Sequence, residues 1–227
     1  MAAPPRSPMT RFRLRPRLSF CSIEGRAVLL DIDRNRYFGL PEPANRALHE
    51  LWQAGGEHPG IVGFESLLRL GIIEPADASE APLGPVQIAV PPHSLLEQAP
   101  VTASGIGRLL PVWRHVVRAR REIARGRFSQ LHARMTAAPP HAAMPVKKMA
   151  EYLSAFRTAR RLVPIEPNCL LDSVALFDHL VRYGLRADLV LGVRLDPFSA
   201  HCWLQTQDWV LNDPAEHAMT MTPILAL

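Results

Sequence analysis

Cys169 occupies a position where a thiol could act as a nucleophile. Pro164 and Pro167 exclude helix before it, and Asn168 is a preferred N-cap residue, so a helix is predicted to begin at Cys169. At that position a thiol meets unpaired backbone N–H groups and the positive end of the helix dipole, which favours the thiolate. The backbone N–H groups at this helix start, that of Cys169 included, could also bind the oxyanion of a tetrahedral intermediate.

His201 and Asp213 could supply the base and the carboxylate that such a thiol needs. Residues 198–206 and 209–212 are rich in strand-forming residues and predict a hairpin. A three-residue turn places His201 opposite Asp213, whereas a two-residue turn places Asp213 opposite Cys202. In the first register the carboxylate orients the imidazole, and the set indicates a Cys-His-Asp triad.

Other interpretations of these side chains remain open. Cys169 alone could be a small buried hydrophobic residue, and Cys169, His201 and Asp213 could bind zinc, although no short chelating pair is present. Cys202 is expected in the core, because neighbours along a strand point to opposite faces. The three cysteines form no CxxC motif, which argues against a disulfide framework and favours a reducing cytoplasm. We therefore expect no metal and no cofactor.

The elements that position these residues follow from hydrophobic periodicity. The second part of the chain predicts an α+β arrangement of helices followed by an antiparallel sheet. The helices are expected at 107–124, 146–162 and 169–183, and the strands at 187–195, 198–206 and 209–212.

The first part of the chain predicts a separate, smaller unit. Three β-rich segments form an antiparallel meander and two helical segments follow it. The strands are expected at 17–23, 27–32 and 36–40, and the helices at 44–53 and 61–70. Six of the 22 prolines fall between 75 and 100, which indicates a linker with at most a short strand at 86–90. The expected domains are 1–75 with a basic N-terminal tail, the linker 76–100, and 101–227.

Charge is unevenly distributed behind the net value of +5. Residues 91–165 hold thirteen Lys and Arg against three acidic residues, so their helices could hold phosphates or an acidic peptide, or simply face solvent. Residues 21–90 hold five Arg against ten acidic residues, which argues against nucleic acid as a partner. No apolar stretch is long enough for a membrane span or a secretory signal, so no membrane partner is expected.

The residues around the predicted triad resemble the lasso-peptide B proteins, transglutaminase-like cysteine proteases that mature ribosomally made peptides. The resemblance covers 168–213 and is most specific in FSAHCW at 198–203 and LND at 211–213. It implies a transglutaminase-like or papain-like protease domain with Cys169 as nucleophile, His201 as base and Asp213 as orienting carboxylate. Cys202 stands where that family more often has a small residue.

The first part of the chain resembles the precursor-peptide recognition elements of the PqqD family, which are small winged-helix-like domains of three strands and two or three helices. The resemblance rests on AVLLD at 27–31, RYFGL at 36–40, the helix at 44–52 and LLRLGII at 67–73. It implies that a leader peptide adds as a strand between the third strand and the last helix. The matching leader-binding residues are Arg36, Tyr37, Phe38, Gly39, Leu40, Phe64, Leu67 and Leu68.

Together the resemblances imply a fused leader peptidase of antibiotic lasso-peptide biosynthesis. It would bind the leader of a precursor peptide and hydrolyse the leader–core bond, and an ATP-dependent, asparagine-synthetase-like cyclase would then close the macrolactam. Two alternatives belong to other classes. One is a winged-helix DNA-binding regulator, suggested by the first unit and its basic tail, and the other is a thiol-dependent amide transferase.

Overall fold

The computed structural model describes residues 11–57, 60–77, 80, 82–98, 109–137 and 145–227. They fall into two compact units, 1–86 and 87–227, and the boundary lies within the predicted linker 76–100. Residues 1–10 of the predicted basic tail and 99–108 at the end of the linker and the start of the next predicted helix lie outside the described residues. The short strand expected at 86–90 does not form.

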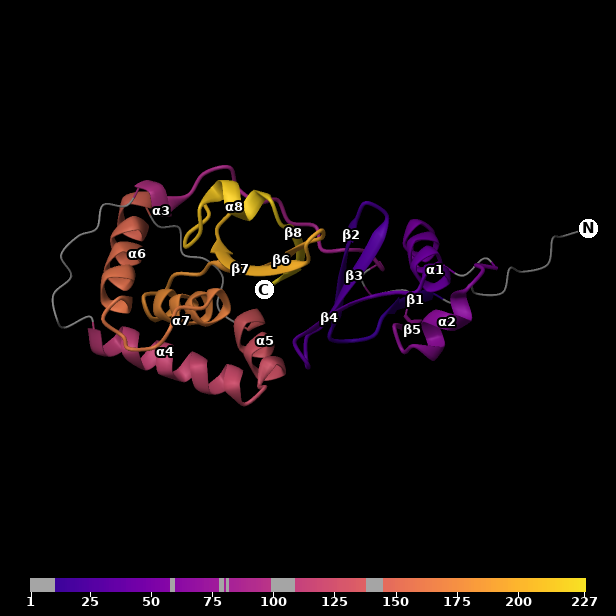
Figure 1. Cartoon of the computed structure of the whole chain (residues 1–227), viewed down its shortest axis with the longest axis horizontal. Coiled ribbons are helices and arrows are strands. Elements are labelled where there is room, and N and C mark those ends of the chain that lie inside the picture. The colour runs from indigo at the N-terminus through magenta and orange to yellow at the C-terminus, as the bar shows by residue number, and fades with distance from the viewer. Residues whose placement is uncertain (1–10, 58–59, 78–79, 81, 99–108, 138–144) are drawn as a thin grey trace, which may run out of the picture. The chain divides into compact units, whose positions relative to one another are not determined.

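The predicted meander forms the larger sheet of the first unit (Figure 1), with strand order β2-β3-β4. Its strands are β2 (Leu18–Ile23), β3 (Arg26–Asp31) and β4 (Arg36–Gly39). The two helices that follow are α1 (Glu42–Gln53) and α2 (Phe64–Arg69). The core between sheet and helices includes Phe20, Leu29, Leu48, Leu51 and Leu67, all fully buried.

A second, two-stranded sheet in the first unit was not expected from the sequence. It pairs β1 (Arg11–Leu14) with β5 (Ile73–Ala76), which lie in the predicted basic tail and at the edge of the predicted linker. Arg13 forms ion pairs of 2.6 Å with Glu74 and 2.7 Å with Glu80. Part of the basic N-terminal segment is therefore strand, stabilised by pairing with residues some sixty positions later in the chain.

The second unit contains the predicted helices and additional ones. Figure 1 shows α7 between the sheet and α4, and α7 is the most deeply buried helix. No helix in the described part of the chain is long and apolar enough to cross a membrane. The helices are α3 (Leu95–Gln98), α4 (Leu109–Ala124), α5 (Phe128–Thr136), α6 (Val146–Arg160), α7 (Cys169–Arg182) and α8 (Ala215–Met219), of which α3, α5 and α8 were not expected.

The sheet of the second unit is antiparallel with the order β7-β6-β8. Its strands are β6 (Asp188–Arg194), β7 (Ser199–Gln205) and β8 (Thr222–Ala226). Gly192 lies where β6 passes Trp203, and a Cβ on it would come within 2.8 Å of the Trp203 ring. The absence of a side chain at 192 therefore lets the fully buried indole pack against the middle of the sheet.

The strand predicted at 209–212 is wrong. Val210 makes only isolated bridges, to Gln205 and to Ser94, and the third strand of the sheet is β8 instead. The turn after β7 holds two residues, because the Thr206 N–H donates to the Trp209 carbonyl at 2.8 Å. The three-residue turn, and with it the direct pairing of His201 with Asp213 across a hairpin, is therefore also wrong.

Candidate active site

Cys169 is the first residue of α7, as the sequence predicts. Asn168 has extended backbone angles, and its Oδ1 accepts hydrogen bonds from the N–H groups of Leu170 at 3.1 Å and Leu171 at 3.3 Å. This N-cap satisfies two of the backbone donors that a helix start leaves unpaired. The thiol is half-buried at the positive end of a 14-residue helix.

His201 on β7 joins Cys169 to Asp213. Its Nε2 lies 3.1 Å from Oδ2 of Asp213, and both side chains are mostly buried. The N–H of Nε2 is not aligned on that oxygen well enough to count as a hydrogen bond, so the contact is one of charge and proximity. The imidazole also hydrogen-bonds the Cys169 thiol. The three residues predicted as a triad are thus brought together.

The contact between His201 and Asp213 does not arise from the predicted pairing across a hairpin. In the observed register Asp213 would face Cys202, but the chain leaves β7 after Leu211, whose N–H donates to the Leu204 carbonyl at 2.8 Å. At the next residue, Asn212, a side chain takes the place of the backbone in the pairing with β7. The Asn212 Oδ1 accepts a hydrogen bond from the Leu204 N–H at 2.7 Å. This departure carries Asp213 back to His201, while Cys202 stays buried in the core as expected.

The electrostatics of the site favour a thiolate and an imidazolium. Burial lowers the pKa of His201, but its contacts with Asp213 and with Cys169 outweigh burial and raise that pKa to about 9. The hydrogen bond with His201 lowers the pKa of Cys169, against the effect of burial, and backbone hydrogen bonds with Cys202 and Leu170 lower it further. Cys202 differs, because burial raises its thiol pKa. Cys169 is therefore the thiol of this unit that is set up to ionise.

Asn212 also ties the nucleophile helix to the strand of the base. Its Nδ2 donates to Oγ of Ser173 at 2.9 Å, and that hydroxyl donates to the carbonyl of Cys202 at 3.2 Å. Ser173 is one turn beyond Cys169 on α7, and Cys202 follows His201 on β7. Asn212 belongs to the LND sequence at 211–213 that resembles the lasso-peptide B proteins, but that resemblance predicted no role for it.

His217 is a second imidazole at the site, and sequence reasoning missed it. Its Nδ1 lies 2.9 Å from Oδ2 and 3.2 Å from Oδ1 of Asp213, and its ring centroid is 4.5 Å from that of His201. The signal that could have revealed His217 is its spacing of four residues from Asp213, because Pro214 between them predicts the start of a helix. Among the described residues, His201, Asp213 and His217 form the group that could share a metal ion, with ligand atoms within 4.8 Å of one another. Cys169 is not part of that group.

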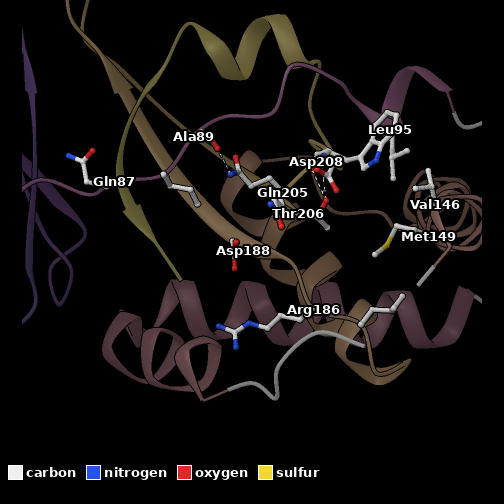
Figure 2. Close-up of a pocket in the computed structure, with 14 residues that line it drawn as sticks. Gln87, Ala89, Leu95, Val146, Met149, Arg186, Asp188, Gln205, Thr206 and Asp208 are labelled. Atoms are coloured by element: carbon white, nitrogen blue, oxygen red, sulfur yellow. Dashed lines mark hydrogen bonds between the residues drawn. The ribbon is translucent and has the colours of Figure 1, made fainter. Parts of the chain in front are cut away.

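Two cavities lie in the second unit at different distances from the triad. The larger, about 720 Å³, is shown in Figure 2, where Gln205 in its lining donates a hydrogen bond to the Ala89 carbonyl. No triad residue lines it, and Gln205 is four residues from His201, about 13 Å along an extended strand. The smaller, about 200 Å³, is bordered by Asp172 and Asn212 next to the triad. Because two of its lining residues are close along the chain to Cys169 and Asp213, the smaller cavity is the more relevant of the two to chemistry.

The predicted leader-binding residues of the first unit differ in accessibility. On β4, Arg36 and Gly39 are exposed, and Tyr37, Phe38 and Leu40 are half-buried. Phe38 packs against the core, so by alternation Tyr37 lies on the other face of the strand. On α2, Phe64 and Leu67 are buried in the core, whereas Leu68 is 42% exposed. Leu68 is thus the residue of the three on this helix that a peptide can reach.

Comparison with known proteins agrees with the geometry of the second unit. A family model described as the transglutaminase-like superfamily matches residues 113–226, just over half of the chain. The matched segment contains Cys169, His201 and Asp213. Comparisons with curated proteins and with solved structures find no match.

Proposed function

This chain belongs to the transglutaminase-like superfamily, and on that basis we propose that it is a cysteine peptidase that removes the leader of a ribosomally made precursor peptide. The observation that carries the proposal is the chain of contacts from the Cys169 thiol through His201 to Asp213. A thiol with a lowered pKa at a helix start, paired with an imidazole, is the arrangement of an activated nucleophile.

In the proposed reaction the Cys169 thiolate attacks the carbonyl carbon of the leader–core bond. The backbone N–H of Cys169, which the Asn168 cap does not occupy, stabilises the oxyanion. His201 gives its proton to the departing amine of the core, which leaves the leader as a thioester on Sγ. His201 then takes a proton from water, the hydroxide attacks the thioester, and the thiol leaves as thiolate. The products are the leader with a free carboxyl group and the core with a free α-amine.

The first unit supports the proposal by offering a site for the leader. β4 is an edge strand of the order β2-β3-β4, and in the described part of the chain no strand pairs with its outer edge. An extended peptide can add to such an edge through its main chain, with side chains read by groups such as Tyr37 and Leu68. Joining leader binding and cleavage in one chain raises the effective concentration of the scissile bond.

The proposed product defines the next reaction. A core peptide with a new α-amine and an unactivated side-chain carboxyl group needs ATP to form a macrolactam, so the proposed partner is an asparagine-synthetase-like cyclase. The same thioester could instead transfer its acyl group to an amine rather than to water. The experiment below distinguishes this amide transfer from hydrolysis by the mass of the product.

The test uses the full chain and synthetic peptides for the short reading frames that neighbour this gene. Mass spectrometry should show a leader acid and a core amine with the unmodified protein, and neither with Cys169→Ala. Cys21→Ala is the matched control, because Cys21 is a buried thiol in the other unit. The Cys21→Ala variant should cleave the peptide at the same rate as the unmodified protein. Cleavage by Cys169→Ala would disprove the assigned nucleophile, and a leader–amine conjugate would identify a transferase. Steeply salt-dependent binding to duplex DNA without cleavage would favour the regulator.

A further inference from the structure

The smaller cavity of the second unit is rich in arginine. Its volume is about 200 Å³, several times the space that a water molecule occupies in the liquid. One carboxylate, that of Asp172, faces three guanidinium groups across it. The lining residues are Leu96 of α3, Leu153, Phe156, Arg157, Arg160 and Arg161 at the end of α6, Asp172 and Leu176 of α7, and Leu211 and Asn212.

Two residues that line the cavity are close to triad residues along the chain. Asp172 is three residues after Cys169 on α7, about 4.5 Å along the helix axis and on nearly the same face. Asn212 immediately precedes Asp213. A side chain close to the carbonyl carbon that Sγ of Cys169 attacks can therefore extend toward the arginine cluster.

Arg160 is the central cation of the cavity. It is only 8% exposed, and its Nε donates to Oδ1 of Asp172 at 2.6 Å while Nη1 donates to the carbonyl of Val163 at 3.4 Å. Its Nη2 is buried and has no hydrogen-bond partner among the residues that the structure describes. A buried N–H group without an acceptor is costly, so this nitrogen marks where an acceptor is expected.

Positive charge exceeds negative charge around that nitrogen. Arg157 is half-buried, and its Nη1 donates a hydrogen bond to the Leu96 carbonyl at 3.2 Å. Burial and the nearby positive charge of Arg161 both lower the pKa of Arg157. Asp172 is the single carboxylate in the lining, and burial raises its pKa although Arg160 opposes this. A bound anion would relieve the repulsion between the arginines and accept from Nη2.

We propose that this cavity binds the carboxylate of an acidic side chain in the peptide substrate, next to the bond that Cys169 attacks. The peptide nature of the substrate rests on the proposed function. Asp172 in the wall repels any anion, but an acidic side chain fits this cavity better than inorganic phosphate because its methylene groups can contact the apolar residues of the lining. The apolar part of the lining matches the methylene groups of a glutamate side chain.

The binding test does not depend on peptidase activity. The full chain labelled with ¹⁵N is titrated with N-acetylglutamate α-amide and, as the neutral isostere, with N-acetylglutamine amide, while inorganic phosphate tests for a general anion site. The glutamate compound alone should shift the backbone amide signals of Arg157, Arg161 and Asp172. Arg157→Gln should weaken its binding by about fivefold or more, whereas Arg120→Gln, which removes an exposed charge from α4, should not. Equal shifts with the glutamine compound, tighter binding of phosphate, or no shifts would overturn the proposal.

The second test places the site in the reaction. For precursor peptides that differ only by Glu or Gln within two residues of the cleaved bond, the ratio of kcat/KM should favour Glu. Arg157→Gln should lower that ratio about tenfold and Arg120→Gln should leave it unchanged. A ratio of one with the unmodified protein would count against the site. If no peptide is cleaved at all, the proposed function fails and the titration alone decides whether the cavity binds a carboxylate.

Discussion

His217 and Asp213 are one helical turn apart, and Nδ1 of His217 lies 2.9 Å from Oδ2 of Asp213. The same oxygen faces Nε2 of His201 at 3.1 Å. The carboxylate that lies against His201 is therefore itself held by a second imidazole on α8. His217 is the more exposed of the two rings, with 44% of its side chain accessible, so it can be changed without opening the core.

Replacing His217 by glutamine tests this relationship. Loss of one hydrogen bond to the carboxylate should loosen Asp213 and lower kcat by about two- to tenfold, with a smaller effect on KM. Steady-state cleavage kinetics provide the measurement. Glu216→Gln, an exposed change on the same helix, is the control and should leave kcat unaltered. An unchanged kcat in His217→Gln would mean that His201 and the backbone alone hold Asp213.

The charge state of the site predicts a bell-shaped pH dependence. Activity should rise with pH as the Cys169 thiol ionises, at a pH below the ordinary thiol range because its hydrogen bond with His201 lowers its pKa. It should fall as His201 loses its proton, near the pKa of about 9 to which Asp213 and Cys169 raise it.

Alkylation by iodoacetamide measures the first of these ionisations directly, because the thiolate is the reactive form. Mass spectrometry should locate the early label on Cys169, since burial raises the pKa of Cys21 to about 12 and also raises that of Cys202. In His201→Asn the midpoint of the alkylation profile should move to higher pH. A midpoint that does not move would show that the helix start, rather than His201, sets the ionisation.

Asn212 should contribute to both stability and rate. In Asn212→Ala the Leu204 N–H and the buried Ser173 hydroxyl each lose a partner, which should cost about 1 to 3 kcal/mol of unfolding free energy. Urea unfolding followed by tryptophan fluorescence gives this value. A double-mutant cycle with Ser173→Ala should show coupling of about 0.5 kcal/mol or more, and additive effects would argue against the proposed link between α7 and β7.

The N-cap of α7 should be separable from the thiol chemistry. Asn168→Ala removes the acceptor for the Leu170 and Leu171 N–H groups and should lower the unfolding free energy by about 1 kcal/mol. Asn168→Asp keeps the acceptor and should retain most of that stability. Equal losses in the two variants would show that something other than capping accounts for the effect. The measurement is the same urea titration.

Some features of the site were predictable because their causes are local. Prolines before Asn168, its capping side chain and the apolar spacing after it are enough to start α7 at Cys169. Alternation along β7 is enough to separate His201 from the buried Cys202. The meander β2-β3-β4 was also predictable, because the turn residues that join its strands act locally.

Other features depend on pairings between distant residues. The strands β1 and β5 pair across some sixty positions, and neither has a periodic signal of its own. Residues 209–212 do not extend the sheet beyond β7, because the Asn212 side chain occupies the Leu204 N–H. The third strand, β8, pairs with β6 at the opposite edge. The arginines at the end of α6 share a cavity with Asp172 only because that helix ends beside α7.

The amino-acid sequence by itself singled out the three residues that the structure brings together, Cys169, His201 and Asp213, and the helix start that favours a thiolate. Only the tertiary structure decided how Asp213 reaches His201, that His217 shares its carboxylate, and that a buried nitrogen of Arg160 finds no acceptor among the described residues. The division has a physical reason: capping and strand alternation act within a few residues, whereas turn length, side-chain substitution in a ladder and the meeting of two helices are set by the whole path of the backbone.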